Sequence, residues 1–462
     1  MFIGREKELK ELNRLYKTNK FQFAVIYGRR RVGKTALINE FIKDKDAIVF
    51  TGLEIDAQTN LENLSKNIFE FENLGDSAPI FGDFQLALEY VYKLSQKKRI
   101  VFVIDEYPYL AKSYPGISSI LQVQIDHKFK NKNIFLIFCG SSMSFMEKQV
   151  LGYRSPLYGR RTAQFKIKPF EFFESNKFFK KFGPQDLAVI YGVTGGVPQY
   201  LSQMDDALTL EENIKNAFLS PSAFLFEKPT NLLKQEVRDP TTYNAVIKAI
   251  ATGCSRNSEI ANKVNISTSA CSEYLNNLVD LGIVKKEIPI VKVTYQKAIY
   301  VLEDGMFKFW YRFIPGNLQQ IQRGFPDKAY KRIEPQIPSF MGKVFEDICG
   351  QYLWKLLLEE KAPIDFENVS RWWGSDPVKK CEVEIDIIAN ESNESAIFAE
   401  CKWTNEKLDL STIENLIEKS ELFRYKNRYF YLFSKSGFTK ACIDKAKENK
   451  NIKLLAFEEM LD

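Results

Sequence analysis

The chain has 462 residues, of which 45% are hydrophobic and 27% are charged, and it contains a single histidine, His127. This composition is that of a globular protein, and the length suggests about three domains. One histidine nearly excludes zinc sites and catalytic triads that are built on imidazole. We therefore expect any acid–base chemistry to use carboxylates, lysine or tyrosine.

Lysine and arginine outnumber aspartate and glutamate by 65 to 59, a mild basic excess that permits nucleic-acid binding without requiring it. The seven cysteines form no C-x-x-C pair, which favours reduced thiols in a cytoplasm over a disulfide framework. The longest apolar runs, such as residues 134–139, are far shorter than the ~20 residues that cross a bilayer. We therefore expect a cytoplasmic protein with no membrane segment.

Residues 28–35 read Gly-Arg-Arg-Arg-Val-Gly-Lys-Thr and match the phosphate-binding pattern G-x-x-x-x-G-K-[ST] at every fixed position. An apolar run at 21–27 predicts a buried strand before this loop, and residues 35–42 predict a helix after it. In that context the backbone N–H groups of the loop surround a phosphate, and the helix N-terminus adds a favourable dipole. Lys34 can reach the β- and γ-phosphates, and Thr35 can ligate Mg²⁺. The motif predicts a site for ATP or GTP, rather than a glycine turn without a ligand, formed by Gly28, Arg29, Arg30, Arg31, Val32, Gly33, Lys34, Thr35 and Ala36.

A second apolar run ends in two acids, Asp105 and Glu106. In P-loop NTPases the first acid after such a strand holds Mg²⁺ and the second activates the attacking water, so we assign those roles here; the alternative is a strand that merely ends in a charged turn. A further buried strand is expected at 133–140, and either of the serines after it, Ser141 or Ser142, could orient that water. The alternation of strands and helices predicts an α/β fold with a doubly wound parallel sheet and the site at the carboxyl ends of the strands.

Four stretches of the first two hundred residues resemble the archaeal-type ATPase family, a relative of the AAA+ and STAND ATPases. They are the start at 2–9, the loop at 28–35, the run VFVIDEYPYL at 101–110 and the run LYGRRT at 157–162. The resemblance implies that ATP is the nucleotide. It also implies a P-loop ATPase core with a helical extension, which we place at residues 1–206.

Two further elements take their roles from this resemblance alone. The run from Gly195 to Tyr200 contains Pro198 and is similar to a Gly-x-Pro element that packs near the adenine in that group. Arg160 or Arg161 is expected to sense the γ-phosphate, either within the chain or from a neighbouring subunit of a homo-oligomer, because an arginine there neutralises charge in the transition state. The alternative is that these arginines belong to a solvated basic loop.

Residues 207–335 are predicted to hold a helical connector and a winged helix-turn-helix domain. Three helices are expected at 241–252, 257–265 and 267–282, followed by two β-rich stretches between 283 and 301, which is the order of that fold. The third helix of such a domain can enter the major groove of DNA. The polar side chains expected to face outward are Ser267, Ser269, Ser272, Glu273, Asn276 and Asn277, with Lys285, Lys286 and Lys292 near the wing.

This third helix has no lysine or arginine, and Glu273 would repel phosphate. DNA is the expected partner of the domain, and contact with another protein is the alternative, because a winged helix can serve either purpose.

A C-terminal α/β domain is predicted at residues 336–462. A helix at 340–349 carries Glu346, and two strands at 382–389 and 396–403 flank a polar turn. A turn centred near residue 393 places Asp386 opposite Glu400. Because side chains alternate along a strand, Glu384 shares a face with Asp386, and Lys402 shares a face with Glu400.

Carboxylates on such a hairpin can bind a hard cation such as Mg²⁺, which activates water and neutralises charge on a scissile phosphate. Lys402 would hold that water or the phosphate. The set Glu346, Asp386 and Glu400-x-Lys402 resembles the PD-(D/E)XK nuclease superfamily. The runs Trp372-Trp373, EIDIIA and ECKW are similar to the nuclease-like domain that is usually fused to archaeal-type ATPases.

The nuclease resemblance implies a site for Mg²⁺, or for Mn²⁺ in its place, on Glu346, Asp386 and Glu400. It implies catalytic roles for Asp386, Glu400 and Lys402. The alternatives are a solvated hairpin face and a nuclease fold without activity.

These features together predict an ATP-binding and ATP-hydrolysing switch that is coupled to a DNA-binding effector, which cleaves DNA with a metal ion. The same motifs also fit a second hypothesis from another class, a non-cleaving regulator. In this hypothesis ATP controls the binding of the winged helix to DNA or to a protein, and the nuclease-like domain is a docking or oligomerisation platform. The lack of basic residues in the third helix favours this alternative.

Overall fold

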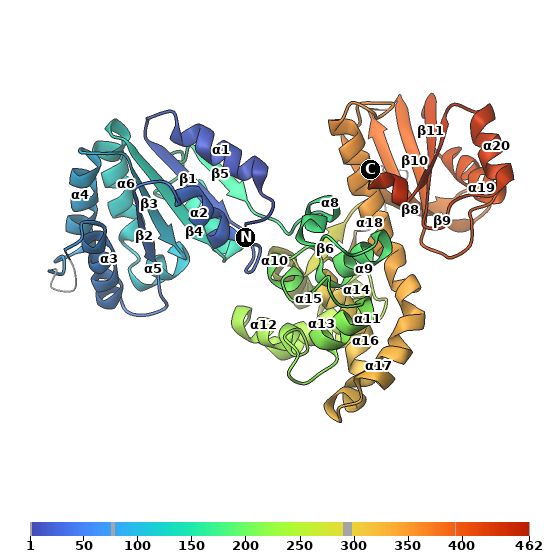
Figure 1. The fold of residues 1–462 in the computed structure, drawn as a ribbon, viewed down its shortest axis with the longest axis horizontal. Helices are drawn as coiled ribbons and strands as arrows, with labels where there is room; N and C mark the ends of the chain where they lie inside the picture. Colours follow the sequence, from blue (N-terminus) through green and yellow to red (C-terminus); the bar gives the residue numbers. More distant parts are fainter. Residues whose placement is uncertain (1, 75–78, 290–297, 393, 462) are drawn as a thin grey trace. The chain divides into compact units, whose positions relative to one another are not determined.

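The computed structural model describes residues 2–74, 79–289, 298–392 and 394–461. The chain divides into two compact units (Figure 1). The first unit consists of Met1–Phe170 with Val197–Gln199, and the second consists of Glu171–Gly196 with Tyr200–Asp462. The three-domain division with boundaries near residues 206 and 335 stays a prediction.

The first unit contains a five-stranded parallel sheet in the order β2-β3-β4-β1-β5. Three of its strands, β1, β3 and β4, are buried along their whole length, as expected where helices cover both faces of a parallel sheet. The strands are β1 Gln22–Tyr27, β2 Ala47–Thr51, β3 Ile100–Asp105, β4 Ile134–Gly140 and β5 Ala163–Lys166.

Alternate residues of β1 face two different cores. Phe23 and Val25 pack into a cluster with α3, α4, α5 and α6, whereas Ala24 and Ile26 pack with α1 and α2. The helices of this unit are α1 Glu6–Tyr16, α2 Lys34–Ile42, α3 Ala57–Phe71, α4 Phe84–Ser95, α5 Tyr107–Ser113, α6 Ile117–His127 and the short α7 Met143–Phe145. The predicted doubly wound parallel sheet is confirmed.

The strand order places β4 between β1 and β3. The carboxyl ends of neighbouring parallel strands lie at one edge of the sheet. The loop after β1, the acids at the end of β3 and the serines after β4 therefore come to the same edge.

The second unit begins with helices and continues into a winged helix. The first helices are α8 Phe172–Ser175, α9 Pro184–Thr194, α10 Pro198–Leu201, α11 Leu210–Phe218 and α12 Lys228–Glu236, of which α10 crosses the division between the units. The winged helix consists of α13 Pro240–Ala251, α14 Asn257–Val264, α15 Thr268–Asp280, β6 Val284–Glu287 and β7 Ile299–Leu302. The predicted order of three helices and two strands is confirmed, while Lys292 lies outside the described residues.

Two side chains of α15 that were expected to face DNA are used inside the domain. Asn277 donates to the hydroxyl of Tyr243 on α13 at 2.6 Å, and Ser272 accepts from Asn257 on α14 at 2.7 Å. Packing of the three helices thus engages these polar groups, although Asn277 is still exposed and Ser272 is half-buried, and contact of either side chain with DNA stays a prediction. The side chains of Ser269, Glu273 and Asn276 are exposed.

The C-terminal part of the second unit is a mixed sheet in the order β12-β11-β10-β9-β8. Strands β8, β9 and β10 are antiparallel, and β10, β11 and β12 are parallel. The elements from the wing to the C-terminus are α16 Gly305–Gln322, α17 Pro326–Ile333, α18 Ile337–Leu358, β8 Asn368–Asp376, β9 Cys381–Glu391, β10 Ser395–Lys402, α19 Leu410–Ser420, β11 Asn427–Ser434, α20 Lys440–Glu448 and β12 Ile452–Ala456. Across the described ranges of both units, no helix has the length and apolar character that a bilayer span requires.

The β9–β10 hairpin has the predicted register. Ala399 pairs with Ile387, and Phe398 pairs with Ile388. Extended by one residue, this register sets Asp386 opposite Glu400. The centre of the turn, residue 393, lies outside the described residues.

Close packing of α16 against the end of α9 depends on Gly305. A Cβ at this position would lie 2.3 Å from the carbonyl oxygen of Gly192 and 2.6 Å from the nitrogen of Gly195. We expect Gly305→Ala to lower the free energy of unfolding by about 2–3 kcal/mol, because the two backbones must move apart. Denaturant titration measures this change.

The matched control is Gly316→Ala on the same helix, where an added Cβ would meet nothing within 4 Å. This variant should be neutral or more stable by up to ~1 kcal/mol, because alanine favours a helix interior over glycine. Equal effects of the two substitutions would contradict the proposed packing constraint.

Candidate functional site

The loop between β1 and α2 has the conformation that its glycines predict. A Cβ at Gly28 would lie 2.1 Å from the carbonyl oxygen of Ile167, so a larger residue would force the backbone to move. Gly33 has a φ of +89° and Arg31 a φ of +73°, so the loop takes the left-handed conformation at two positions. Turns of this kind direct successive backbone N–H groups into one concavity, which is the arrangement that binds phosphate.

Lys34, at the first residue of α2, is only 6% exposed. Its ammonium donates to the carbonyl oxygens of Gly28 at 2.8 Å and Arg29 at 3.0 Å. Burial lowers the pKa of Lys34, against the opposing effect of nearby acids. A phosphate oxygen is a stronger acceptor than a carbonyl, so this ammonium is suited to exchange its loop partners for a phosphate.

Thr35 and Asp105 form the contact expected between a P-loop and the acid of the neighbouring motif. The hydroxyl of Thr35 donates to Oδ2 of Asp105 at 3.1 Å, and Oδ1 of Asp105 accepts from the backbone N–H of Glu106 at 2.9 Å. Asp105 is 8% exposed. A hydroxyl and a carboxylate oxygen side by side are ligands that suit Mg²⁺.

Glu106 is held in a strained backbone conformation with φ +46° and ψ +45°. Its Oε2 accepts from the backbone N–H of Ser141 at 3.2 Å and from the hydroxyl of Ser141 at 3.0 Å. Strain of this kind in a residue other than glycine is concentrated at functional sites. Of the two serines after β4, the structure thus brings Ser141 to Glu106.

Pro198 lies beside the P-loop, since a Cβ at Gly33 would be 3.7 Å from its Cγ. Arg30 of the loop donates to the hydroxyl of Tyr109 at 2.7 Å.

Arg160 is bound within its own unit. Its Nε lies 3.0 Å from Oδ2 of Asp126 on α6, and its Nη1 donates to the carbonyl oxygen of Pro156 at 2.8 Å. The hydrogen bonds from this guanidinium lower the pKa of Asp126 to about 2. Arg160 therefore fastens its loop to α6 in this structure, and γ-phosphate sensing by Arg160 or Arg161 stays a prediction.

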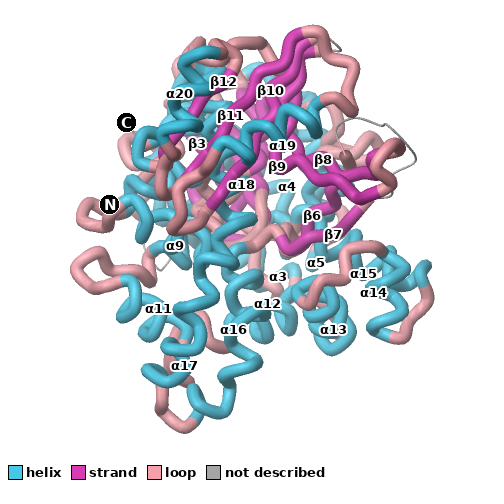
Figure 2. Tube along the Cα trace, turned by 90° about the vertical axis from the view of Figure 1, so that its right-hand side faces the viewer, coloured by secondary structure: helices cyan, strands magenta, loops and turns pink. Residues whose placement is uncertain are grey.

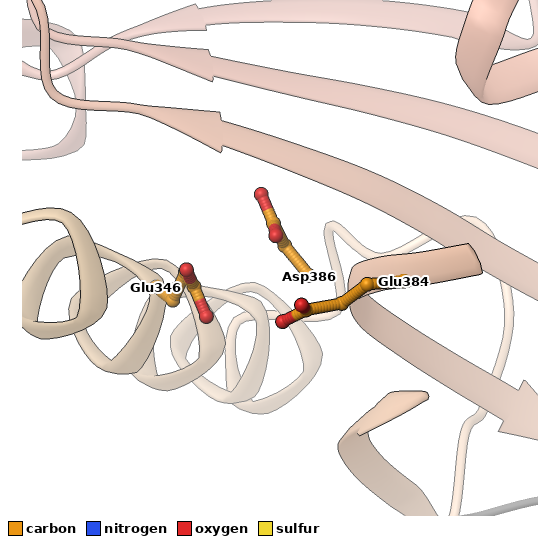
Figure 3. A group of neighbouring side chains, drawn as sticks. All are labelled: Glu346, Glu384 and Asp386. Atoms are coloured by element: carbon orange, nitrogen blue, oxygen red, sulfur yellow. The ribbon is translucent and has the colours of Figure 1, made fainter. Parts of the chain in front are cut away.

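The second candidate site is an acid cluster that consists of Glu346, Glu384 and Asp386 (Figure 3). One carboxylate oxygen of each lies within 4.8 Å of the others. Glu346 comes from α18, and the other two come from alternate positions of β9. Figure 3 shows the helix residue facing the two strand residues. Three carboxylates at this spacing are suited to a hard divalent cation.

Glu400 lies beside the acid cluster. Its carboxylate contacts the ammonium of Lys402, and its Oε2 lies 3.6 Å from Nζ of Lys419 on α19. Nζ of Lys402 is also 4.0 Å from Oδ2 of Asp386. The structure thus groups Glu384 with Glu346 and Asp386, whereas the sequence analysis predicted Glu400 as the third metal ligand.

Burial shifts the pKa values of two members of the acid cluster upward, and ion pairs shift the third downward. Burial raises the pKa of Glu346 to about 7, and the nearby Asp386 acts in the same direction. Burial raises the pKa of Asp386, and the negative charge of Glu400 adds a smaller effect in the same direction. Burial also opposes ionisation of Glu384, but hydrogen bonds from a lysine and an arginine outweigh it and lower the pKa of this group to about 2. The carboxylates repel one another, and a cation between them would relieve this repulsion.

Three families match parts of the chain. Residues 2–204 match an ATPase domain predominantly from Archaea, residues 250–285 match a winged helix-turn-helix DNA-binding family, and residues 310–414 match a family of archaeal and bacterial proteins of unknown function. An uncharacterized protein of Methanocaldococcus jannaschii is 34% identical over 426 residues, which are 91% of this chain and 92% of the relative. The chain belongs to the archaeal ATPase family.

Two further proteins are similar to parts of this chain. An uncharacterized ATP-binding protein of Methanocaldococcus jannaschii is 49% identical over 45 residues, which are 10% of this chain and 76% of that protein. The solved structure of a Walker-type ATPase from Pyrococcus abyssi is similar with a TM-score of 0.51 and 18% identity, over 67% of this chain and 96% of that one. At this identity the second similarity shows the fold alone.

One member of the acid cluster, Glu384, and three cations around it, Lys343, Arg371 and Lys419, were not predicted as site residues. Lys343 precedes Glu346 by one helical turn, and this spacing could have indicated an ion pair. Glu384 was on the expected face of its strand. Arg371 and Lys419 reach the site through pairing and packing between distant segments, which no local pattern reveals.

We expect Glu106→Gln to retain ATP binding and to lower kcat for ATP hydrolysis by about 10²–10⁴, because an amide cannot accept the proton of the attacking water. Phosphate release and binding of a fluorescent ATP analogue measure the two effects. The control is Glu70→Gln, an exposed glutamate on α3, which should leave both unchanged. Hydrolysis at the wild-type rate by Glu106→Gln would show that another group activates the water.

Proposed function

We propose that this chain is an ATP-hydrolysing switch that controls a DNA-binding effector. The ATPase part of this proposal rests on a series of hydrogen bonds at one edge of the sheet. Lys34 donates to carbonyl oxygens of its loop, Thr35 donates to Asp105, and Glu106, which follows Asp105, accepts from Ser141. Each of these groups has a place in nucleotide hydrolysis, and together they form a complete set.

In this proposal Lys34 turns from its own loop to the phosphates of ATP. Thr35 and Asp105 hold Mg²⁺, which supplies neutralisation of the phosphate charge. Glu106 accepts the proton of the attacking water. The contact with Ser141 keeps the carboxylate of Glu106 engaged until the nucleotide arrives, so hydrolysis depends on release of this contact.

The effector that we propose consists of the winged helix and the acid cluster. The winged helix binds DNA, in keeping with its family. Glu346, Glu384 and Asp386 hold Mg²⁺ or Mn²⁺, which supplies an activated water and neutralises a scissile phosphate. Lys402 holds the phosphate, and Glu400 positions Lys402 through their ion pair.

A second candidate function is favoured by a specific observation. Lys343 and Arg371 form ion pairs with Glu346 and Glu384, so the acid cluster already has cationic partners in this structure. In a non-cleaving regulator these pairs would be permanent, and the C-terminal domain would serve as a docking platform.

A cleavage assay separates the two candidates. We expect the purified chain to cleave plasmid, linear, branched or single-stranded DNA with Mg²⁺ or Mn²⁺, and Asp386→Asn to reduce this rate by about 10²-fold or more, because the activated water is lost. The matched control is Glu382→Gln, an exposed acid on the same strand, which should cleave as wild type. No cleavage of any substrate, with ATP hydrolysis intact, would favour the regulator.

The ATP site is tested by Lys34→Ala. Loss of a buried ammonium that pairs with phosphate should weaken ATP binding by about 2 kcal/mol or more, a factor of about 30. Isothermal titration calorimetry measures the affinity, and the cleavage assay repeated with and without ATP shows whether the switch controls the effector. Wild-type affinity in Lys34→Ala would contradict the proposed nucleotide site.

A further inference from the structure

Arg371 lies at an irregularity of β8, where the pairing with β9 shifts. A bulge of this kind re-aims a side chain, and here the guanidinium reaches three carboxylates. Its Nε lies 3.6 Å from Glu346, its Nη1 lies 3.3 Å from Glu287, and its Nη2 contacts Glu384. Each of the three guanidinium nitrogens therefore faces a different acid.

The three acids come from three separate elements. Glu346 and Glu384 belong to the acid cluster, whereas Glu287 is the last residue of β6, the first strand of the wing, which lies beside β8 (Figure 2). The side chains of Glu287 and Glu346 are 11% and 10% exposed, so the ion pairs of Arg371 with these two acids are largely buried, whereas Glu384 is 45% exposed and its ion pair with Arg371 is open to solvent. Through this one cation, the wing and the acid cluster are linked.

A divalent cation would compete with side chains for the same oxygens. Lys343 donates to Glu346 at 3.0 Å and to Glu384 at 2.8 Å, and Arg371 contacts the same two acids. A metal ion bound by both carboxylates would compete with these two cations. The hold of Arg371 is incomplete, because its Nε is buried without a hydrogen-bond partner and 3.6 Å is too long for a hydrogen bond.

We infer that Arg371 is a latch on the acid cluster and that the wing sets this latch through Glu287. The inference rests on the proposed metal site. With Glu287 in place, the guanidinium is held at three points. Because the guanidinium is a rigid plane, it leaves Glu346 and Glu384 only by giving up its contact with Glu287 as well. Loss of the Glu287 contact therefore lowers the cost of metal entry.

DNA on the wing supplies a means of release. Nζ of Lys285 lies 3.0 Å from Glu287, and Lys286 beside it is exposed. A DNA phosphate held by these lysines brings negative charge next to Glu287 and competes for Lys285, which drives Glu287 away from its present position. Duplex DNA then raises the affinity for metal, and metal raises the affinity for DNA by the same factor.

The test measures Mn²⁺ binding to the full chain by electron paramagnetic resonance. Nucleotide is absent, and every protein carries Asp105→Asn to remove the metal ligand of the P-loop site. Glu287→Gln and Arg371→Gln should each raise the Mn²⁺ affinity about fivefold or more. In the Arg371→Gln protein, Glu287→Gln should add nothing, because the latch is already gone. The control is Glu414→Gln, an exposed acid on α19, which should change nothing.

Asp386→Asn separates this inference from the proposed function. If Asp386→Asn abolishes Mn²⁺ binding but Glu287→Gln binds at the parent strength, the metal site stands and the latch is wrong. If Asp386→Asn binds as well as the parent, or no variant binds, the acid cluster is not a metal site and both proposals fail. Circular dichroism checks that each variant is folded. Should Arg371→Gln not fold, Arg371→Lys takes its place, since a lysine cannot make the three-point contact.

Discussion

A charge that is taken out of water needs a partner, and both candidate sites of this chain are arranged around that requirement. Lys34 is held by the carbonyl oxygens of its own loop. Glu346 and Glu384 are held by Lys343 and Arg371. In both sites the chain itself provides the partners that a more strongly charged ligand would replace. Any affinity for ATP or metal is therefore a difference between two sets of contacts.

The parts of these sites that depend on local spacing could be predicted from the sequence. The P-loop is one continuous run of eight residues, and its glycines meet steric demands that the structure shows directly, as at Gly28. The pairing of Ala399 with Ile387 follows from the position of a short polar turn, because an antiparallel hairpin has one register for a given turn centre. The strand that leads to Asp105 and Glu106 was equally clear from its apolar run.

The parts that depend on contacts between distant segments could not be predicted in this way. Arg371 reaches Glu287 because β8 is bulged and lies beside the wing, and neither fact has a local signature. Arg160 pairs with Asp126 because its loop packs on α6. Asn277 bonds to another helix of its domain, although its position on an outward-looking polar stripe suggested DNA. A polar residue on a helix surface has several competing partners, and only the packing selects among them.

The ion pairs around the acid cluster have a consequence for how a polyanion would approach it. The formally negative groups in this network are Glu287, Glu346, Glu384, Asp386 and Glu400, and the positive groups in contact with them are Lys285, Lys343, Arg371, Lys402 and Lys419. With every acid ionised, five charges of each sign balance; because burial raises the pKa of Glu346 to about 7, the set becomes net positive as the pH falls below that value. The field of such a set largely cancels within a Debye length, so it neither draws in nor repels a nucleic acid from afar. This set of charges therefore exerts little long-range attraction or repulsion on a nucleic acid, and recognition there begins only on contact.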